Sequence, residues 1–143
     1  MPKTLAVYAG AFLTSRGKTA LRLWWQANVS PLESKSFGHH MTIKFKPSDE
    51  ELYELMERLG GVGETVQLRI VGYAEDADLG VQAVVVEGVY STNDNPHVTV
   101  ATDGAKPFLS NKLLKRGYTD VRGAALEARL GYFDGRADRF ELP

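Results

Sequence analysis

The stretch Gly38-His39-His40-Met41-Thr42-Ile43-Lys44-Phe45-Lys46 alternates between polar and apolar side chains from His40 onward. Because successive side chains of a β-strand point to opposite faces of the sheet, a strand here has two distinct faces. The apolar face suits a core and carries Met41, Ile43 and Phe45. The polar face carries His40, Thr42, Lys44 and Lys46. The stretch therefore predicts a half-buried strand that presents an imidazole and a hydroxyl on one side, with their Cα atoms about 7 Å apart.

A second stretch, residues 96–102, repeats this design. His97 and Thr99 point one way, and Val98 and Val100 point the other. A single His-x-Thr-x word is a common accident in a chain with three histidines. Two copies, each with apolar residues at both x positions, favour a functional pair of strands over two ordinary strands with satisfied histidines.

The words His40-Met41-Thr42-Ile43 and His97-Val98-Thr99-Val100 together resemble the signature of the two-histidine (2H) phosphoesterases. That superfamily includes 2′-5′ RNA ligase-like proteins, cyclic phosphodiesterases of RNA repair and 2′,3′-cyclic nucleotide phosphodiesterases. Residues 104–111 are also similar to the segment after the second motif in some phage and RNA-ligase-associated members. The resemblance implies an α+β, bilobal fold in which two antiparallel β-sheets form a central cleft, with helices packed outside and one motif contributed by each lobe.

The chemistry of these residue types fits the resemblance. Opening a cyclic phosphodiester with water requires one group that takes a proton from the water and one that gives a proton to the departing ribose oxygen. Two histidines with ordinary pKa values near 6.5 share those tasks at neutral pH, and Thr42 and Thr99 can donate to the non-bridging oxygens. The residues leave the order open; analogy with the cyclic phosphodiesterases favours His97 as base and His40 as acid.

The expected function is metal-independent hydrolysis of the 2′,3′-cyclic phosphate of RNA ends or cyclic nucleotides, with no cofactor. One alternative is a hydrolase of 2′-5′ or 3′-5′ (cyclic) oligonucleotide signals, which uses the same residues. The other alternative is a non-catalytic module that binds RNA ends or nucleotides. A pure binder has no need of two proton-transfer groups, so the paired motif favours an enzyme.

Further polar residues are candidates for the edge of such a site. A substrate rim of positive charge is expected from four lysines: Lys44, Lys46, Lys106 and Lys112. For each of them a solvated surface position is an equally good interpretation. His39 falls on the opposite strand face from His40, which predicts a structural or peripheral role for it.

Composition bounds the class of protein. The chain has 143 residues, 43% of them hydrophobic, which fits a single domain over residues 1–143 with a real core. A net charge of −1 gives no overall positive field for nucleic acid, so any polyanion site is local. The absence of cysteine excludes disulfides and thiolate metal sites. Without a long apolar run or signal-peptide pattern, we expect a cytoplasmic monomer that does not enter membranes.

Periodicity and capping signals predict the order β-α-β-α-β-β-β-α-β-β. The expected strands are 5–13, 39–46, 65–73, 81–90 and 96–102, with one or two more within 120–142, and the expected helices are 17–27, 48–59 and 106–115. The segment from Gly10 to Gly17-Lys18-Thr19 differs from a P-loop because six residues, not four, separate its glycines. The acidic residues 75–78 are interpreted as a hairpin tip and not as a metal site.

Overall fold

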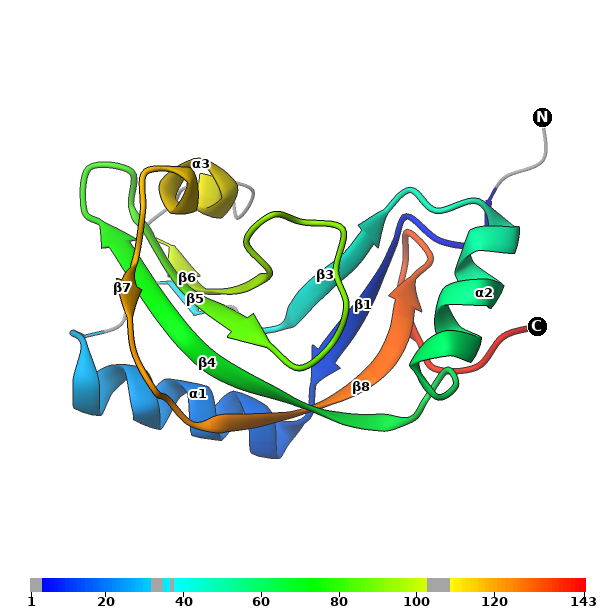
Figure 1. Cartoon of the computed structure of the whole chain (residues 1–143), viewed down its shortest axis with the longest axis horizontal. Coiled ribbons are helices and arrows are strands. Elements are labelled where there is room, and N and C mark those ends of the chain that lie inside the picture. The colour runs from blue at the N-terminus through cyan, green and yellow to red at the C-terminus, as the bar shows by residue number, and fades with distance from the viewer. Residues whose placement is uncertain (1–3, 32–34, 37, 103–108) are drawn as a thin grey trace.

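The computed structural model describes residues 4–31, 35–36, 38–102 and 109–143, and within them it has three helices and nine strands (Figure 1). The helices are α1 (Ser15–Asn28), α2 (Asp49–Leu59) and α3 (Leu109–Lys115). The strands are β1 (Tyr8–Leu13), β2 (Lys35–Ser36), β3 (His40–Phe45), β4 (Thr65–Asp76), β5 (Val81–Glu87), β6 (His97–Thr102), β7 (Thr119–Asp120), β8 (Ala125–Phe133) and β9 (Asp138–Arg139). The α+β class and the predicted element order are confirmed, with β2 and β7 as additional two-residue strands.

The strands form one antiparallel sheet, so the expectation of two separate sheets is wrong. The order is β7-β4-β5-β6-β3-β1-β8-β9, β2 pairs with β6, and β4 also pairs with β8. The group β4-β5-β6 therefore meets the group β3-β1-β8 twice. One contact is the five-residue β4–β8 ladder, and the other is a β3–β6 bridge at Met41 and Val98. The two motif strands lie side by side at that bridge.

The apolar faces of the motif strands enter the main core. Met41, Ile43, Val98 and Val100 are fully buried. Phe45, expected on the same face, is instead 61% exposed, with the Lys46 ammonium 5.3 Å from its ring centre. Strand β3 ends at Phe45, where the left-handed backbone of Lys46 turns the chain toward α2, so this ring lies beyond the part of the sheet that the core covers.

Helix α1 lies below β4 in Figure 1, packs against β8, and buries Leu21 and Trp25. Its N-cap is Thr14, whose hydroxyl accepts from the Gly17 amide. A Cβ on Gly17 would collide with the Glu127 carbonyl of β8. Gly17 therefore serves close helix–strand packing, in agreement with the interpretation that this segment is not a P-loop.

Helix α2 begins with the predicted capping box, in which the Ser48 hydroxyl and the Glu51 carboxylate each accept from the other residue's backbone amide. It buries Leu52 and Met56, and it ends at Gly60, whose positive φ of 114° suits a residue without a Cβ.

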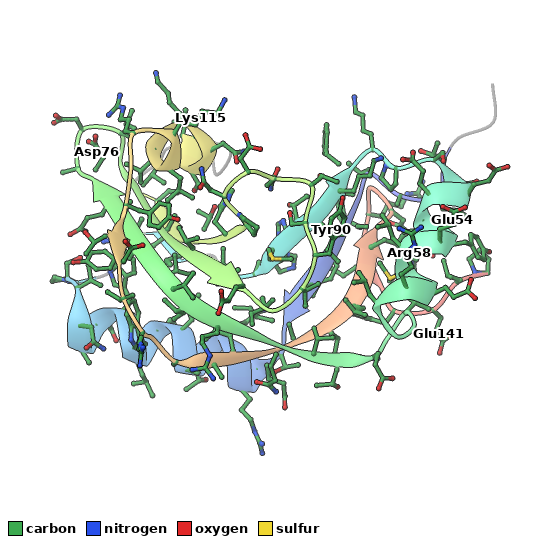
Figure 2. The ribbon with its side chains drawn as sticks, viewed as in Figure 1. Glu54, Arg58, Asp76, Tyr90, Lys115 and Glu141 are labelled. Carbon is green, nitrogen blue, oxygen red and sulfur yellow. The ribbon has the colours of Figure 1, made fainter. Side chains whose placement is uncertain are left out.

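Two hairpins complete the sheet. The tip between β4 and β5 is closed by Asp76, whose carboxylate accepts from the amides of Asp78 and Leu79, so the acidic cluster is a turn as predicted. Figure 2 shows Asp76 far from the end of the molecule that carries α2. The predicted turn at Asp134 returns β8 to β9 and sets Asp138 opposite Phe133. In the described part of the chain, no helix is both long and apolar enough to cross a membrane.

Candidate active site

The four motif side chains gather on the face of β3 and β6 that lies away from the core. Met41 and Val98 face each other and are fully buried. Their neighbours His40, Thr42, His97 and Thr99 are half-buried on the other face. The two imidazoles lie close enough for a charge on His97 to act on His40. The alternation expected from the sequence therefore holds at these four positions and brings the two motifs together.

His97 is held in one tautomer by its own strand entry. Its Nδ1 lies 2.8 Å from the carbonyl oxygen of Asn95. Because a carbonyl only accepts, Nδ1 carries the hydrogen, and the neutral ring keeps its lone pair on Nε2. Burial lowers the pKa of His97, and the Asn95 carbonyl partly opposes this shift. At neutral pH the ring is therefore an uncharged proton acceptor at Nε2.

His40 is enclosed by aromatic rings from β1. Tyr8 stacks on it with ring centres 4.6 Å apart and planes at 25°, and the Phe12 ring centre lies 5.7 Å away. Burial, and then charge on His39 and His97, lower the pKa of His40 to about 3. The expectation of two histidines with ordinary pKa values is therefore wrong. Both rings are neutral at pH 7, because side chains that are remote in sequence enclose them.

His39 contacts His40 directly, so its expected place on the opposite strand face is wrong. The two Nδ1 atoms are 2.8 Å apart, and His39 Nε2 lies 2.7 Å from the Asp138 carboxylate. The reason is the backbone just before β3. Gly38 has a left-handed φ of 46°, and the strand begins only at His40. His39 therefore lies outside the regular alternation of β3, and its ring contacts that of His40.

Thr99 is supported by a residue that the motif does not contain. Its hydroxyl lies 2.7 Å from that of Ser110, which is fully buried on α3. Ser110 belongs to residues 104–111, the stretch that resembles family members after the second motif; residues 103–108, which include Lys106, lie outside the described residues. The resemblance of this stretch is the sequence signal that pointed to Ser110, although it did not specify the contact.

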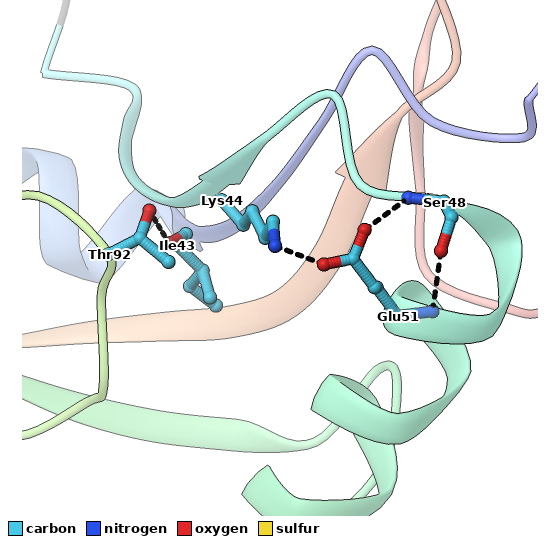
Figure 3. Close-up of polar contacts among 5 residues, drawn as sticks. All are labelled: Ile43, Lys44, Ser48, Glu51 and Thr92. Carbon is cyan, nitrogen blue, oxygen red and sulfur yellow. Dashed lines mark hydrogen bonds and ion pairs between the residues drawn. The ribbon is translucent and has the colours of Figure 1, made fainter.

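The loop before His97, residues 91–95, is hydrogen-bonded to β3. The Ser91 hydroxyl donates to the Thr42 carbonyl at 2.8 Å, and the amide and hydroxyl of Thr92 both donate to the Ile43 carbonyl (Figure 3). These bonds fix the path by which the chain reaches Asn95 and thus the carbonyl that orients His97. The first motif strand therefore helps to position the histidine of the second.

Three of the four lysines expected as a substrate rim lie among the described residues, and their surroundings differ. Lys44 is engaged by the Glu51 carboxylate of α2 (Figure 3), and this contact is the main cause that lowers the pKa of Glu51 to about 2. Lys46 lies near the exposed Phe45 ring. Lys112 is exposed, and it points away from the site because it follows the inward-facing Ser110 by two residues, about 200° around the helix.

Two surface depressions flank this loop of residues 91–95. One, of about 300 Å³, lies between the loop and α3. Its lining is Thr92, Asn93, Asp94, Asn95, Asn111 and Lys115. The other, of about 160 Å³, lies between α2 and the loop, where Figure 2 shows Tyr90 near Arg58. Sequence reasoning missed Lys115, which lines the larger depression together with Asn95, whereas Lys112 is not part of that lining.

The donor set of this site consists of imidazoles and hydroxyls. Among the described residues, no group of three or more histidine, cysteine, aspartate and glutamate side chains is arranged to hold a metal ion. Comparison of the chain with models of known protein families and with curated proteins gives no match. The geometry of the site therefore carries the functional argument by itself.

Proposed function

We propose that this protein is a metal-independent phosphodiesterase of the two-histidine type that opens 2′,3′-cyclic phosphates of RNA ends or nucleotides. The observation that carries the proposal is the pairing of the two motifs. Each imidazole has its Nδ1 occupied by a neighbouring group, which leaves Nε2 for the reaction, and a threonine hydroxyl lies two residues from each ring on the same face.

The roles follow from the ring partners. His97, whose Nε2 has a lone pair, takes a proton from the attacking water as a new P–O bond forms. The bond to the departing ribose oxygen breaks, and that oxygen takes a proton from His40 Nε2. Thr42 and Thr99 donate to the non-bridging oxygens, where negative charge accumulates. Water and a cyclic diester thus give one phosphate monoester with a free neighbouring hydroxyl.

The arrangement of strands supports the two-lobed fold of that superfamily. Strand β3 belongs to the group β3-β1-β8 and strand β6 to the group β4-β5-β6, so each group contributes one motif. Their single bridge sets the two motifs beside each other. A phosphate bound there would contact a histidine and a threonine from each group.

The decisive experiment measures hydrolysis of 2′,3′-cyclic AMP and of oligonucleotides that end in a cyclic phosphate. His40→Ala and His97→Ala are each expected to lower the rate by about 10²-fold or more, because a positioned acid or base provides ~10²–10⁴. Circular dichroism checks that the variants stay folded. A wild-type protein without activity on any of these substrates, or a variant that retains the wild-type rate, overturns the proposal.

A second measurement concerns metal dependence and substrate. Activity is expected to survive EDTA, because the proposed steps use imidazoles and hydroxyls. Loss of activity with chelator, restored by zinc or manganese, would transfer the chemistry to a metallophosphodiesterase. A panel of 2′,3′-cyclic, 2′-5′ and 3′-5′ linked substrates then identifies which phosphodiester the site prefers.

A further inference from the structure

We infer that Asp138 and His39 form a proton relay behind His40 and supply the proton that His40 gives to the leaving oxygen. This inference rests on the proposed function. His40 needs such a source of protons, because an enclosed imidazole next to two others does not readily hold a proton of its own. The three groups come from separate places: the residue just before β3, the start of β3, and β9.

The number of hydrogens that fit between Asp138, His39 and His40 limits the protonation states of this hydrogen-bonded series. The Asp138 carboxylate accepts, so His39 Nε2 carries a hydrogen across the 2.7 Å contact. Only one hydrogen fits between the two Nδ1 atoms, which are 2.8 Å apart. When His39 is neutral, its Nδ1 accepts, and neutral His40 has a lone pair on Nε2. When His39 carries a second proton, it donates to His40, and neutral His40 then bears its hydrogen on Nε2.

The second state makes His40 a proton donor without a charge on its own ring. In the transfer step, the leaving ribose oxygen takes the hydrogen from His40 Nε2, and His40 Nδ1 takes the hydrogen from His39 Nδ1. Both imidazoles end neutral, and His39 remains hydrogen-bonded to Asp138. One proton has moved from the Asp138–His39 pair to the ribose oxygen, and no electrons are transferred to or from the protein.

Exposure and neighbouring charges suit this role. The side chains of His39 and Asp138 keep 36% and 27% of their surface exposed, so water can return the proton after each cycle. The nearby Arg139 guanidinium binds Asp134 at 2.7 Å, and within the described residues the Asp138 carboxylate contacts His39 Nε2.

The remaining groups around the relay hold no competing proton at neutral pH. Tyr8 and Phe12 of β1 cover the two rings. Burial, and then the charge on Asp138, raise the pKa of the Tyr8 phenol to about 12, so that phenol stays neutral. From β6, His97 faces His40 and is itself neutral, because burial lowers its pKa. Among the groups around His40, the Asp138–His39 pair is therefore the one whose hydrogen bonds can pass a proton to it.

The test uses Asp138→Asn, which removes the charge, and His39→Gln, which keeps hydrogen-bonding groups but cannot pass a proton. The matched control is Asp134→Asn, which alters the same hairpin at an aspartate bound to Arg139. With 2′,3′-cyclic AMP, we expect kcat to fall about 10- to 100-fold in both relay variants, part of the ~10²–10⁴ of a positioned acid, with KM nearly unchanged. We also expect the basic limb of the kcat profile to move to lower pH in Asp138→Asn. Neither change is expected in the control.

Two further measurements distinguish proton transfer by His39 and Asp138 from a purely structural role of these residues. A nucleoside 3′-(4-nitrophenyl phosphate) releases a phenolate that needs no acid, so the relay variants should lose much less rate on it than on 2′,3′-cyclic AMP. Independently of activity, ¹⁵N spectra of the imidazoles should record His40 changing from the Nδ1–H to the Nε2–H tautomer on acidification in the wild type but not in His39→Gln. A His40 tautomer that stays the same at all pH values, or relay variants with wild-type kcat and pH profile, overturns the relay.

A wild-type protein that is inactive on every cyclic substrate overturns the proposed function. The tautomer measurement then still decides whether the hydrogen bonds between Asp138, His39 and His40 behave as inferred.

Discussion

The two His-x-Thr motifs carry the same residue types on neighbouring strands, but the groups behind them differ. Behind His97 stands a backbone carbonyl, which can only accept a hydrogen. Behind His40 stands another imidazole, which can accept or donate. The threonines differ too, because Thr99 contacts the buried Ser110, whereas the Thr42 hydroxyl forms no hydrogen bond with the described part of the chain.

The motif thus fixes which atoms are present, and the groups behind it decide what those atoms do. A fixed acceptor gives His97 a single neutral tautomer, which suits a base. A partner that titrates gives His40 two tautomers, which suits a group that must donate a proton and then recover it. The supporting groups therefore assign the two roles that the identical motifs leave open, and variants on each side can test this assignment.

Among the variants that leave both histidines in place, the largest loss of kcat is expected from the threonines. Thr42→Val and Thr99→Val each keep shape and strand propensity but delete one donor to the phosphate. Each should lower kcat by about 10²–10³-fold, or about 3–4 kcal/mol. Their stabilities should differ, because only Thr99→Val strands the buried Ser110 hydroxyl, at a cost of about 1–3 kcal/mol. Steady-state kinetics and urea unfolding measure both quantities.

Thr42→Ser and Thr99→Ser serve as controls and should recover much of the rate. If both Val variants run within about threefold of wild type, an effect near 0.65 kcal/mol, the hydroxyls only form strand and the phosphate-binding role is wrong. Equal stability of the two Val variants would remove the contrast that Ser110 creates.

The next effect is a pH dependence of stability that His40 dominates. Its pKa is about 3 in the folded protein and near 6.5 when unfolded, so only the unfolded chain takes up the proton between those values. The stabilisation is therefore complete above about pH 6.5 and is lost as the pH falls toward 3. At about 1.4 kcal/mol per pKa unit, reduced for partial access to water, we expect a loss on the order of 2–3 kcal/mol.

Urea unfolding across this pH range, compared between wild type and His40→Gln, isolates that contribution from the carboxylates. As the pH falls, the free energy of unfolding should decrease less in His40→Gln than in the wild type. His97→Gln should differ less from the wild type, because the Asn95 carbonyl opposes the pKa shift at His97. Parallel curves for wild type and His40→Gln would show that His40 is not kept neutral by the fold.

The sequence predicted the parts of the site that depend on local periodicity. Alternation located the four motif residues, and the capping signals located α2. It failed at Phe45, because the end of a strand is not visible as a change in residue type. It failed at His39 because the strand begins only at His40, after the left-handed backbone of Gly38, and no local pattern records that start.

The groups behind the motifs were out of reach for the same reason. Asp138 is 99 residues from His39, and it arrives through the β8–β9 hairpin. The rings that bury His40 and lower its pKa belong to β1, which is separated from β3 in the sequence by α1 and β2. Pairing of β4 with β8, which joins the two strand groups a second time, likewise depends on partners that are distant in sequence.

A smaller effect is expected from the serines that support each motif. Ser110→Ala removes the group that holds the Thr99 hydroxyl, whereas Ser91→Ala removes a bond to the Thr42 backbone only. A typical hydrogen bond contributes about 0.5–1.5 kcal/mol. We therefore expect Ser110→Ala to lower kcat about 3- to 10-fold and Ser91→Ala to leave it within about twofold, in the same kinetic assay. The reverse order would mean that the strand position, not the hydroxyl orientation, limits the second motif.

The smallest effect should distinguish the lysines beside the two motifs. Lys44 is already paired with Glu51, so an approaching phosphate meets little net charge there. Lys115 lines the depression next to Asn95 and is not part of an ion pair among the described residues. A surface charge about 8 Å from a phosphate contributes roughly 0.5 kcal/mol in water and about 2 kcal/mol in a partly shielded site. We expect Lys115→Met to raise KM about two- to fivefold at low salt and to lose that effect at high salt, because mobile ions screen exposed charges.

Two control variants change the other lysine. Lys44→Met should change KM less, and Glu51→Gln, which releases the Lys44 charge, should lower KM slightly. A larger effect of Lys44→Met than of Lys115→Met would place the substrate on the α2 side of the loop instead of the α3 side.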